Sequence, residues 1–325
     1  MTTASERRAD DFLLGYERRV RSQGNGGRIR IPKKAGIKNI TAAAQKKPEV
    51  MVKIPRRKGS STNVAGVARH LDYISRNGEL ALEDKNGHLH QGKEAKELAK
   101  NWQLAGLIHD NSGKKEALNL VLSMPAGIDP YKVRAGAKSF VSDVFAEHEY
   151  VFVLHTDEDH PHVHVCVAMQ NEHGRRLNPR KQDLYHWRVM FAEKMREQGV
   201  ECAATRRVHR GQFTKSERGE IRHIKKRGGQ SWVDYQQLHE IKAALKGNQR
   251  PVHPFLKEQL ASRNLVIKEY RALSKMLYAD GMKTEAKAVS QLAQQLQGKS
   301  PRTQAQQQYD AAKALHKNKD VDIEM

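Results

Sequence analysis

The sequence has little cysteine and no long apolar run. Only Cys166 and Cys202 occur among 325 residues, too few for a disulfide framework or a cysteine-based metal site. We therefore expect both to be packing residues in a reducing compartment, the cytoplasm. No apolar run approaches the length of a membrane-spanning helix and no signal peptide opens the chain, so we expect no membrane insertion.

Negative charge and aromatic residues are also scarce. The chain has 58 Lys and Arg against 37 Asp and Glu, a formal net charge of +21. Such an excess exceeds what solubility requires and favours a polyanionic partner, nucleic acid first; an anionic membrane surface would also fit the charge. Aromatic residues make up only 6% of the chain, so phosphate contacts rather than base stacking should dominate binding, which should then depend strongly on salt.

Composition divides the chain into four segments. Residues 1–48 are basic, glycine-rich in part and poor in apolar periodicity, which predicts a mostly disordered arm. Residues 49–205 alternate strand-like and helix-like patterns and form the expected catalytic domain. Residues 206–231 read as a flexible basic linker, and residues 232–325 as a helical extension rich in Leu, Ala, Gln and Lys.

The most informative stretch is YVFVLHTDEDHPHVHVCVAMQN, which begins at Tyr150. Two runs of β-branched and aromatic residues flank an acidic, proline-containing connection, a pattern that predicts an antiparallel hairpin. Side chains alternate along a strand, so His162 and His164 should point to one face while the valines between them point into a core. His155 ends the preceding strand and can bring a third imidazole to the same place.

Three neutral imidazoles with open coordination positions are typical of a catalytic divalent metal that also holds a substrate oxygen. We therefore expect His155, His162 and His164 to be the ligands, and Asp157 to be a carboxylate that fixes a histidine tautomer. The alternative is that histidines on an exposed strand face are merely solvated. His160, which precedes Pro161 in the turn, is expected to be exposed and not to bind metal.

A second candidate site is a tyrosine on a predicted helix. A helix capped by Thr62 or Asn63 should run to about residue 76, with its apolar residues on one stripe. Tyr73 lies opposite that stripe, flanked by Arg69 at i−4 and Arg76 at i+3. Two guanidinium groups would hold a phosphodiester and favour the phenolate, as a tyrosine nucleophile requires. By geometry alone, an ordinary surface tyrosine remains as good an interpretation.

These motifs resemble those of the tyrosine relaxases of conjugative and mobilisable plasmids, within the superfamily of His-hydrophobe-His endonucleases. His155-x-Asp157, His162-x-His164 and Asn171 resemble the relaxases' third motif, and HTDEDHPHVHV is especially similar to the T-DNA border endonuclease branch. HLDYIS, which contains Tyr73, resembles the first motif, and Ser123 aligns with the serine of the second. One departure is that the family usually carries its tyrosine much nearer the N-terminus.

The resemblance implies an α+β fold, with a central antiparallel sheet, flanking helices and then the helical extension. It implies a bacterial, cytoplasmic enzyme that nicks one strand of origin-of-transfer DNA through a 5′-phosphotyrosyl intermediate on Tyr73, with Mg²⁺ or Mn²⁺ as the metal. Asp157 would orient a histidine or take the proton of the tyrosine. Relaxosome accessory proteins and a type IV secretion coupling protein are the implied partners. DNA contacts are expected from the basic loop at Arg56 and Arg57 and from three further residues: Arg69, Arg76 and Ser123.

Two other classes remain open on the sequence. A rolling-circle replication initiator of the same superfamily would use the same histidines and tyrosine, although the histidine and aspartate before the His-x-His pair favour a relaxase. A non-enzymatic DNA-binding protein with a structural metal is the other. It predicts that Tyr73→Phe leaves every activity unaltered.

Overall fold

A computed structural model describes most of the chain. The described residues are 3–14, 20–21, 28–29, 34–55, 62–110, 112–212, 217, 219–252, 254–299 and 303–321. Arg56 and Arg57, two expected DNA contacts, lie outside these residues. The chain divides into two compact units, one of residues 1–205 with 273–289 and one of residues 206–272 with 290–325. In the described part, none of the helices combines the length and apolar character needed to cross a membrane.

A six-stranded antiparallel sheet forms the centre of the first unit. Its strands follow the order β3 (Met51–Lys53), β6 (Ala117–Ser123), β8 (His162–Ala168), β7 (Tyr150–His155), β4 (Leu82–Asp84) and β5 (Leu89–His90). The predicted hairpin is the pair β7 and β8 at the middle of this sheet. A separate pair, β1 (Val20–Arg21) and β2 (Arg28–Ile29), is also antiparallel. The α+β fold expected from the sequence is confirmed.

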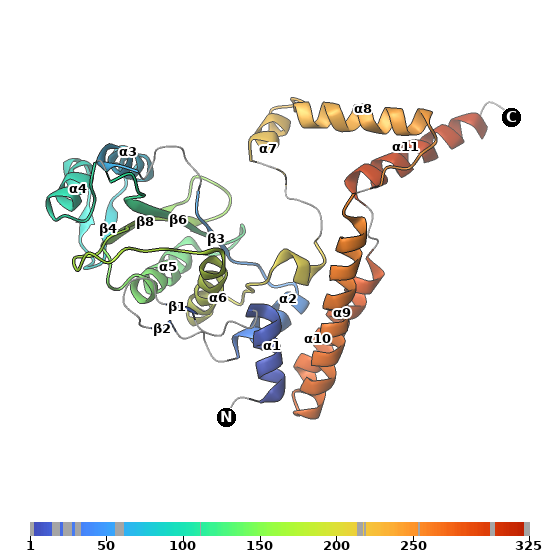
Figure 1. Ribbon diagram of the computed structural model, residues 1–325, viewed down its shortest axis with the longest axis horizontal. Coiled ribbons are helices and arrows are strands. Elements are labelled where there is room, and N and C mark those ends of the chain that lie inside the picture. Colours follow the sequence, from blue (N-terminus) through green and yellow to red (C-terminus); the bar gives the residue numbers. More distant parts are fainter. Residues whose placement is uncertain are drawn as a thin grey trace. The chain divides into compact units, whose positions relative to one another are not determined.

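Helices cover both faces of the sheet. Figure 1 shows α3 (Val64–Ile74) and α4 (Lys93–Leu104) on one side of the strands, with α5 (Pro130–Val144) and α6 (Lys181–Glu197) on the other. A side-chain cap marks the start of one helix on each face: the Asn63 side chain accepts a hydrogen bond from the Gly66 N–H at 2.8 Å at the start of α3, and Asp129 caps α5 just before a proline at its first position.

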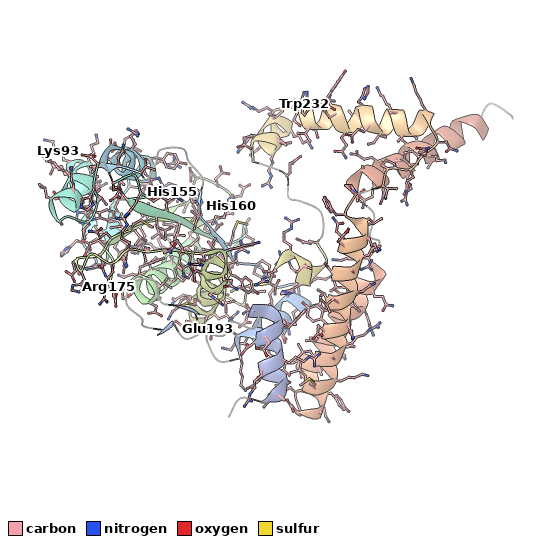
Figure 2. All side chains as sticks on the ribbon, viewed as in Figure 1. Lys93, His155, His160, Arg175, Glu193 and Trp232 are labelled. Atoms are coloured by element: carbon pink, nitrogen blue, oxygen red, sulfur yellow. The ribbon has the colours of Figure 1, made fainter. Side chains whose placement is uncertain are left out.

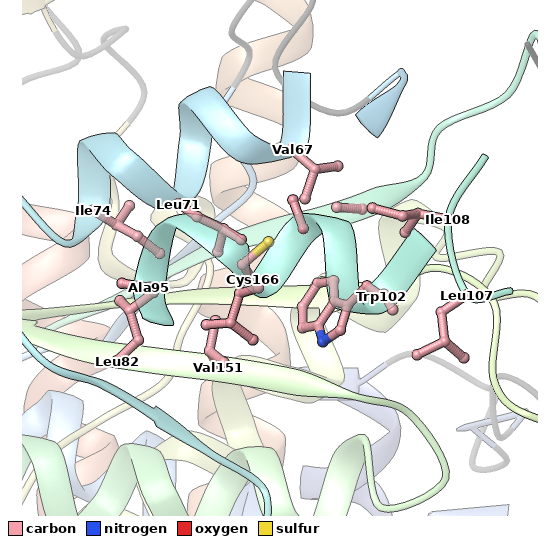
Figure 3. Packing of buried hydrophobic residues seen from close by; sticks show 14 of the residues in the cluster. Val67, Leu71, Ile74, Leu82, Ala95, Trp102, Leu107, Ile108, Val151 and Cys166 are labelled. Atoms are coloured by element: carbon pink, nitrogen blue, oxygen red, sulfur yellow. The ribbon is translucent and has the colours of Figure 1, made fainter. Parts of the chain in front are cut away.

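The sheet is buried on both faces, so its central strands pack against two cores. Figure 3 shows the core on the α3 and α4 side, where Leu71 of α3 and Trp102 of α4 pack against Val151 and Cys166 of the sheet. On the opposite face, Val163, like the other alternate valines of β8, is fully buried. The histidines lie on the same face of the sheet as Val151 and Cys166, so they share that face with the core formed by α3 and α4. Burial of each large apolar side chain contributes about 1.5–3 kcal/mol to stabilising this core.

The structure differs from the sequence-based expectation near the N-terminus. Within the arm expected to be mostly disordered, it describes α1 (Ala4–Leu14) and α2 (Ala35–Ala44). A Cβ at Gly36 would meet the backbone of Ala9 at 2.4 Å, so only glycine permits this helix crossing. The Asn39 side chain accepts a hydrogen bond from the Ala204 N–H at 2.7 Å. Charge dominates the composition of this region and conceals the small apolar faces that pack.

The second unit is helical, as expected of the extension. It contains η1 (Arg207–Arg210), α7 (Gly219–Lys226), α8 (Trp232–Lys246) and α11 (Gln304–Val321), while α9 (Leu256–Ala279) and α10 (Lys283–Gly298) contribute residues to both units. The hydroxyl of Tyr270 donates a hydrogen bond to the His209 carbonyl at 3.0 Å. Arg250 pairs with Asp310 through two hydrogen bonds of 2.9 and 2.6 Å. The segment expected as a flexible linker contains η1 and α7.

Candidate metal centre and nucleophile

Three histidines meet where β7 ends and β8 begins. His155 and His162 are directly opposite each other in the antiparallel register, and His164 follows two residues later on the same face. Ring centroids are 5.3 Å apart for His155 and His162, 4.5 Å for His155 and His164, and 5.2 Å for His162 and His164. One ligating nitrogen from each ring lies within 4.8 Å of the other two. Figure 2 labels His155, and His160 in the neighbouring turn.

Backbone carbonyls orient two of these rings. The Nε2 atom of His155 lies 2.7 Å from the Ile74 carbonyl oxygen, and a carbonyl can only accept, so Nε2 carries the proton and Nδ1 keeps its lone pair. The Nδ1 atom of His162 lies 3.2 Å from the His160 carbonyl oxygen, which leaves Nε2 as its ligand atom. A metal-binding histidine is usually held in this way, by a hydrogen bond from its other nitrogen.

The surroundings also favour neutral imidazole at His155. Burial lowers the pKa of His155 below its ordinary value, and the positive charge of Arg76 acts in the same direction, whereas the hydrogen bond to Ile74 and the Asp157 carboxylate oppose them. Only the neutral ring offers a lone pair to a metal. The donor set thus fits a divalent cation: three imidazoles, at least two with a defined tautomer, on neighbouring strands that fix their spacing.

Arg76 connects the histidines to Asp157. Its guanidinium group forms an ion pair with the Asp157 carboxylate and lies 3.4 Å from Nδ1 of His155. An Asp157 oxygen lies 3.9 Å from the same nitrogen. In this structure Asp157 therefore holds Arg76, while the tautomer of His155 is fixed by Ile74. Arg76 can reach both groups because it follows the end of α3 in the left-handed conformation, with φ at 53°.

Tyr73 lies beside the histidines, on the last turn of α3. Its ring meets that of His164 edge-on, with centroids 6.0 Å apart, and the guanidinium carbon of Arg76 lies 5.5 Å from the ring centre. Val67 and Leu71 are fully buried on the other side of the helix, whereas Tyr73 is 37% exposed. The helical pattern predicted this orientation. The phenol is thus accessible to a ligand while it remains next to a candidate metal centre.

The other residues predicted for the site have different surroundings. Ser123 pairs directly with His162 across β6 and β8, and its hydroxyl donates to the Met124 carbonyl at 3.4 Å. Arg69 is exposed on α3, one turn before Tyr73. Asn171 is buried after β8, where its side chain accepts hydrogen bonds from the backbone N–H groups of His173 and Arg175 at 3.1 and 2.9 Å. Asn171 therefore shapes a turn.

Sequence reasoning missed the part played by the end of α3. The carbonyl of Ile74 orients a metal-ligand candidate, yet every residue has a carbonyl, so no sequence signal marks it. The close approach of Gly78 to Gly92, where a Cβ would meet the Gly92 Cα at 2.9 Å, fixes the segment that follows. A glycine four residues after Ile74 was the one available sign of a constrained turn.

Comparison with known proteins identifies the same region. Residues 73–200 match the family model described as Relaxase: MobA/VirD2-like, nuclease domain. The T-DNA border endonuclease VirD2 of Agrobacterium fabrum is 26% identical over 206 residues, which cover 54% of this chain and 46% of the relative. The VirD2 proteins of Rhizobium radiobacter and Rhizobium rhizogenes are each 26% identical, over 50% and 51% of this chain and 43% and 42% of their own lengths.

The chain therefore spans less than half the length of these curated relatives. The matched region contains Tyr73 and all three histidines. These similarities support a DNA-nicking enzyme of the relaxase kind and confirm the resemblance seen in the sequence: residues 73–200 are similar to the nuclease domain of the MobA/VirD2-like relaxases.

Proposed function

We propose that this protein is a DNA relaxase that nicks one strand at an origin of transfer by tyrosine transesterification, for conjugative transfer or mobilisation. The observation that carries the proposal is the position of Tyr73, an exposed phenol with its ring 6.0 Å from that of His164. A nucleophile next to three convergent imidazoles has the arrangement that metal-assisted phosphoryl transfer requires.

In this proposal His155, His162 and His164 hold a divalent cation, Mg²⁺ or Mn²⁺, which would polarise a non-bridging oxygen of the scissile phosphate. The Tyr73 oxygen attacks the phosphorus, a bond forms between them, and the bond from phosphorus to the 3′ oxygen breaks. The 3′-hydroxyl leaves with a proton, and the 5′ phosphate stays on Tyr73. The phosphotyrosine conserves the energy of the phosphodiester, so the same site can rejoin the strand.

Arg76 and Asp157 complete the proposed site. Arg76 lies over the Tyr73 ring and pairs with Asp157, so it can bring positive charge to a phosphate held between the phenol and the histidines. Asp157 is half exposed and is proposed to take the proton of the tyrosine or to help orient His155. Arg69 and Ser123, together with Arg56 and Arg57, are proposed to hold the DNA strand near the nick.

The proposed setting follows from the same similarity. The substrate would be supercoiled or single-stranded origin-of-transfer DNA, in the bacterial cytoplasm. Relaxosome accessory proteins and a type IV secretion coupling protein are the proposed partners. The net charge of +21 supports a polyanionic substrate.

The test is a covalent adduct. The full chain is incubated with end-labelled single-stranded origin DNA and Mg²⁺ or Mn²⁺, denatured, and separated by size. Wild-type protein should carry label through denaturation, and Tyr73→Phe should not, because the variant lacks only the attacking oxygen. Peptide mapping of the adduct should find the DNA on Tyr73, and DNA on any other tyrosine would overturn the assignment.

Tyr150→Phe is the matched control. Tyr150 lies on the opposite face of the sheet from the histidines, because residues of β7 alternate faces and His155 is an odd number of positions away. It is buried, and burial raises the pKa of its phenol. Its variant should still form the adduct. If Tyr150→Phe also abolishes the adduct while the protein stays folded, loss of adduct in Tyr73→Phe no longer identifies the nucleophile.

A further inference from the structure

One face of α8 carries aromatic residues followed by basic residues. At 100° per residue, five side chains fall within an arc of about 80° on this helix, a set we call the α8 stripe: Trp232, Tyr235, His239, Lys242 and Lys246. All five are exposed. At 1.5 Å per residue the stripe is about 21 Å long. The structure describes every residue of α8, and none of its acidic residues falls within this arc.

The aromatic end of the stripe is not part of a core. Trp232 is 73% exposed and Tyr235 is 64% exposed, whereas Ile241, on the opposite side of the helix, is buried. Figure 2 labels Trp232 at the start of α8. Gln237, away from the stripe, donates a hydrogen bond to Gln308 of α11 at 3.0 Å. The helix thus packs through one side and leaves two large aromatic side chains on the other.

The start of α8 is fixed next to a basic segment. Ser231 caps the helix, accepting a hydrogen bond from the Asp234 N–H at 3.2 Å. Lys225 of α7 pairs with Asp234 at 2.9 Å and with Glu217. That contact holds α7 next to the first turn of α8, and three further cations of α7 and its C-terminal end are exposed: Arg222, Lys226 and Arg227. Exposed cations of α7 therefore precede the aromatic pair along the chain, and Lys242 and Lys246 follow it on the stripe.

We propose that α7 and the α8 stripe form a binding surface for single-stranded DNA, separate from the residues proposed for nicking. Exposed aromatic rings stack on unpaired bases, and a track of Lys and Arg follows the phosphates. An apolar protein partner would not require cations at both ends. Duplex DNA keeps its bases stacked internally and offers the rings no base face. The surface does not depend on Tyr73, so it can bind DNA whether or not the chain nicks it.

The three tryptophans make a direct test possible. Trp102 and Trp187 are 5% and 1% exposed, so Trp232 should account for the quenchable fluorescence. Full-length protein carrying Tyr73→Phe, which prevents cleavage, is titrated with an oligothymidine that contains no nick site. The emission should be quenched as DNA binds. Quenching should be much weaker with a duplex of the same length.

Variants measure the contribution of the stripe. Trp232→Ala should weaken oligothymidine binding about tenfold, measured by fluorescence anisotropy of labelled DNA, since stacking on one base contributes roughly that much. Lys242→Gln with Lys246→Gln should reduce the salt slope of log affinity by about 1–2. Val233→Ala, an exposed apolar residue of the same helix outside the stripe, is the matched control and should bind as the parent does.

Two outcomes would overturn the proposal. The first is that oligothymidine binds without quenching the emission of Trp232, and that the folded Trp232→Ala variant keeps its affinity for single-stranded DNA. The second is a change in sedimentation, from oligomer to monomer, with unaltered DNA affinity, which would make the stripe a contact between copies of this chain. If wild-type protein forms no covalent adduct while quenching of Trp232 by oligothymidine is retained, the proposed nicking activity is contradicted and this proposal is left intact.

Discussion

The individual histidines at the candidate metal centre have different roles. His162 and His164 point toward His155 because they alternate with buried valines on β8. His160 stacks on His162 with ring centroids 5.7 Å apart, yet its ring is exposed, and only its carbonyl orients a ligand. Replacement of the His160 side chain leaves that carbonyl in place. His162 thus offers a ring nitrogen to a metal, whereas His160 contributes only the backbone carbonyl that orients the His162 ring.

Replacing His162 or His164 by Ala should therefore lower Mn²⁺ affinity by more than about 100-fold, beyond the effect of losing an orienting hydrogen bond. Calorimetric titration measures the affinity, and the adduct assay should show cleavage lost in parallel. Binding of single-stranded DNA should change little, because phosphate contacts come from elsewhere. His160→Ala is the control and should bind Mn²⁺ as the wild type does. An equal loss in His160→Ala would mean that the ligand set is wrong.

For single residues of the candidate site, the sequence predicted the features that depend on residue type and on spacing along a strand or a helix. The histidine cluster and the outward-facing Tyr73 both follow from counting residues along a strand or a helix. The pairing of Arg76 with Asp157 and the hydrogen bond from His155 to Ile74 could not be predicted, because each depends on how a chain reversal places two distant segments. Backbone carbonyls in particular leave no trace in the residue pattern.

Among the elements, α3 has the greatest influence on the candidate site. It carries Tyr73, and its last turn supplies the Ile74 carbonyl to His155, so the nucleophile and a metal ligand are positioned by one rigid helix. The residues that follow, Arg76, Asn77 and Gly78, all have positive φ. Two of these three are not glycine, which costs on the order of 1 kcal/mol each and is typical of segments near functional sites. Periodicity predicted α3 itself but not this turn.

Gly78→Ala should disturb both functions of α3. Its φ of 91° is unfavourable for alanine and its Cβ would meet Gly92, so the turn must move. We expect a loss of about 1–3 kcal/mol in the free energy of unfolding, with weaker Mn²⁺ binding and less adduct. Gly87→Ala has almost the same φ, 88°, with nothing within 4 Å of the Cβ, so it is the matched control. The Gly87→Ala variant should lose stability but keep its Mn²⁺ affinity and its yield of adduct. Unchanged metal affinity in Gly78→Ala would contradict the link through Ile74.

Over the whole molecule, the sequence predicted the local elements better than it predicted contacts between distant segments. The central hairpin and the helical extension are confirmed, since each shows a repeat within a few residues. The first unit nevertheless includes residues 273–289, where Asp280 accepts a hydrogen bond from Ser5 of α1. A contact across that length of chain leaves no local signal. The same reason explains why α1 and α2 were not foreseen in a segment dominated by charge.

The candidate site should function without the second unit. The proposed metal ligands and Tyr73 all lie between residues 73 and 164, and Thr205 closes this part through two hydrogen bonds to Glu49, at 2.9 and 2.6 Å. A fragment of residues 34–205 keeps α2 on α6, through the ion pair of Lys38 with Glu193 at 2.6 Å, and omits α1, whose contacts with residues 273–289 would otherwise be broken.

We expect this fragment to bind Mn²⁺ and to form the covalent adduct with short single-stranded origin DNA as the full chain does. It should bind oligothymidine more weakly and with a smaller salt slope, because it lacks the α8 stripe and α7. Calorimetry, the adduct assay and anisotropy measure the three quantities on the same preparation. A fragment ending at Thr205 that retains α1 is the comparison: it should bind Mn²⁺ and form the adduct as the 34–205 fragment does, while its α1 should exchange hydrogen faster than α1 of the full chain. A folded fragment with impaired metal binding would show that the omitted residues help to shape the site.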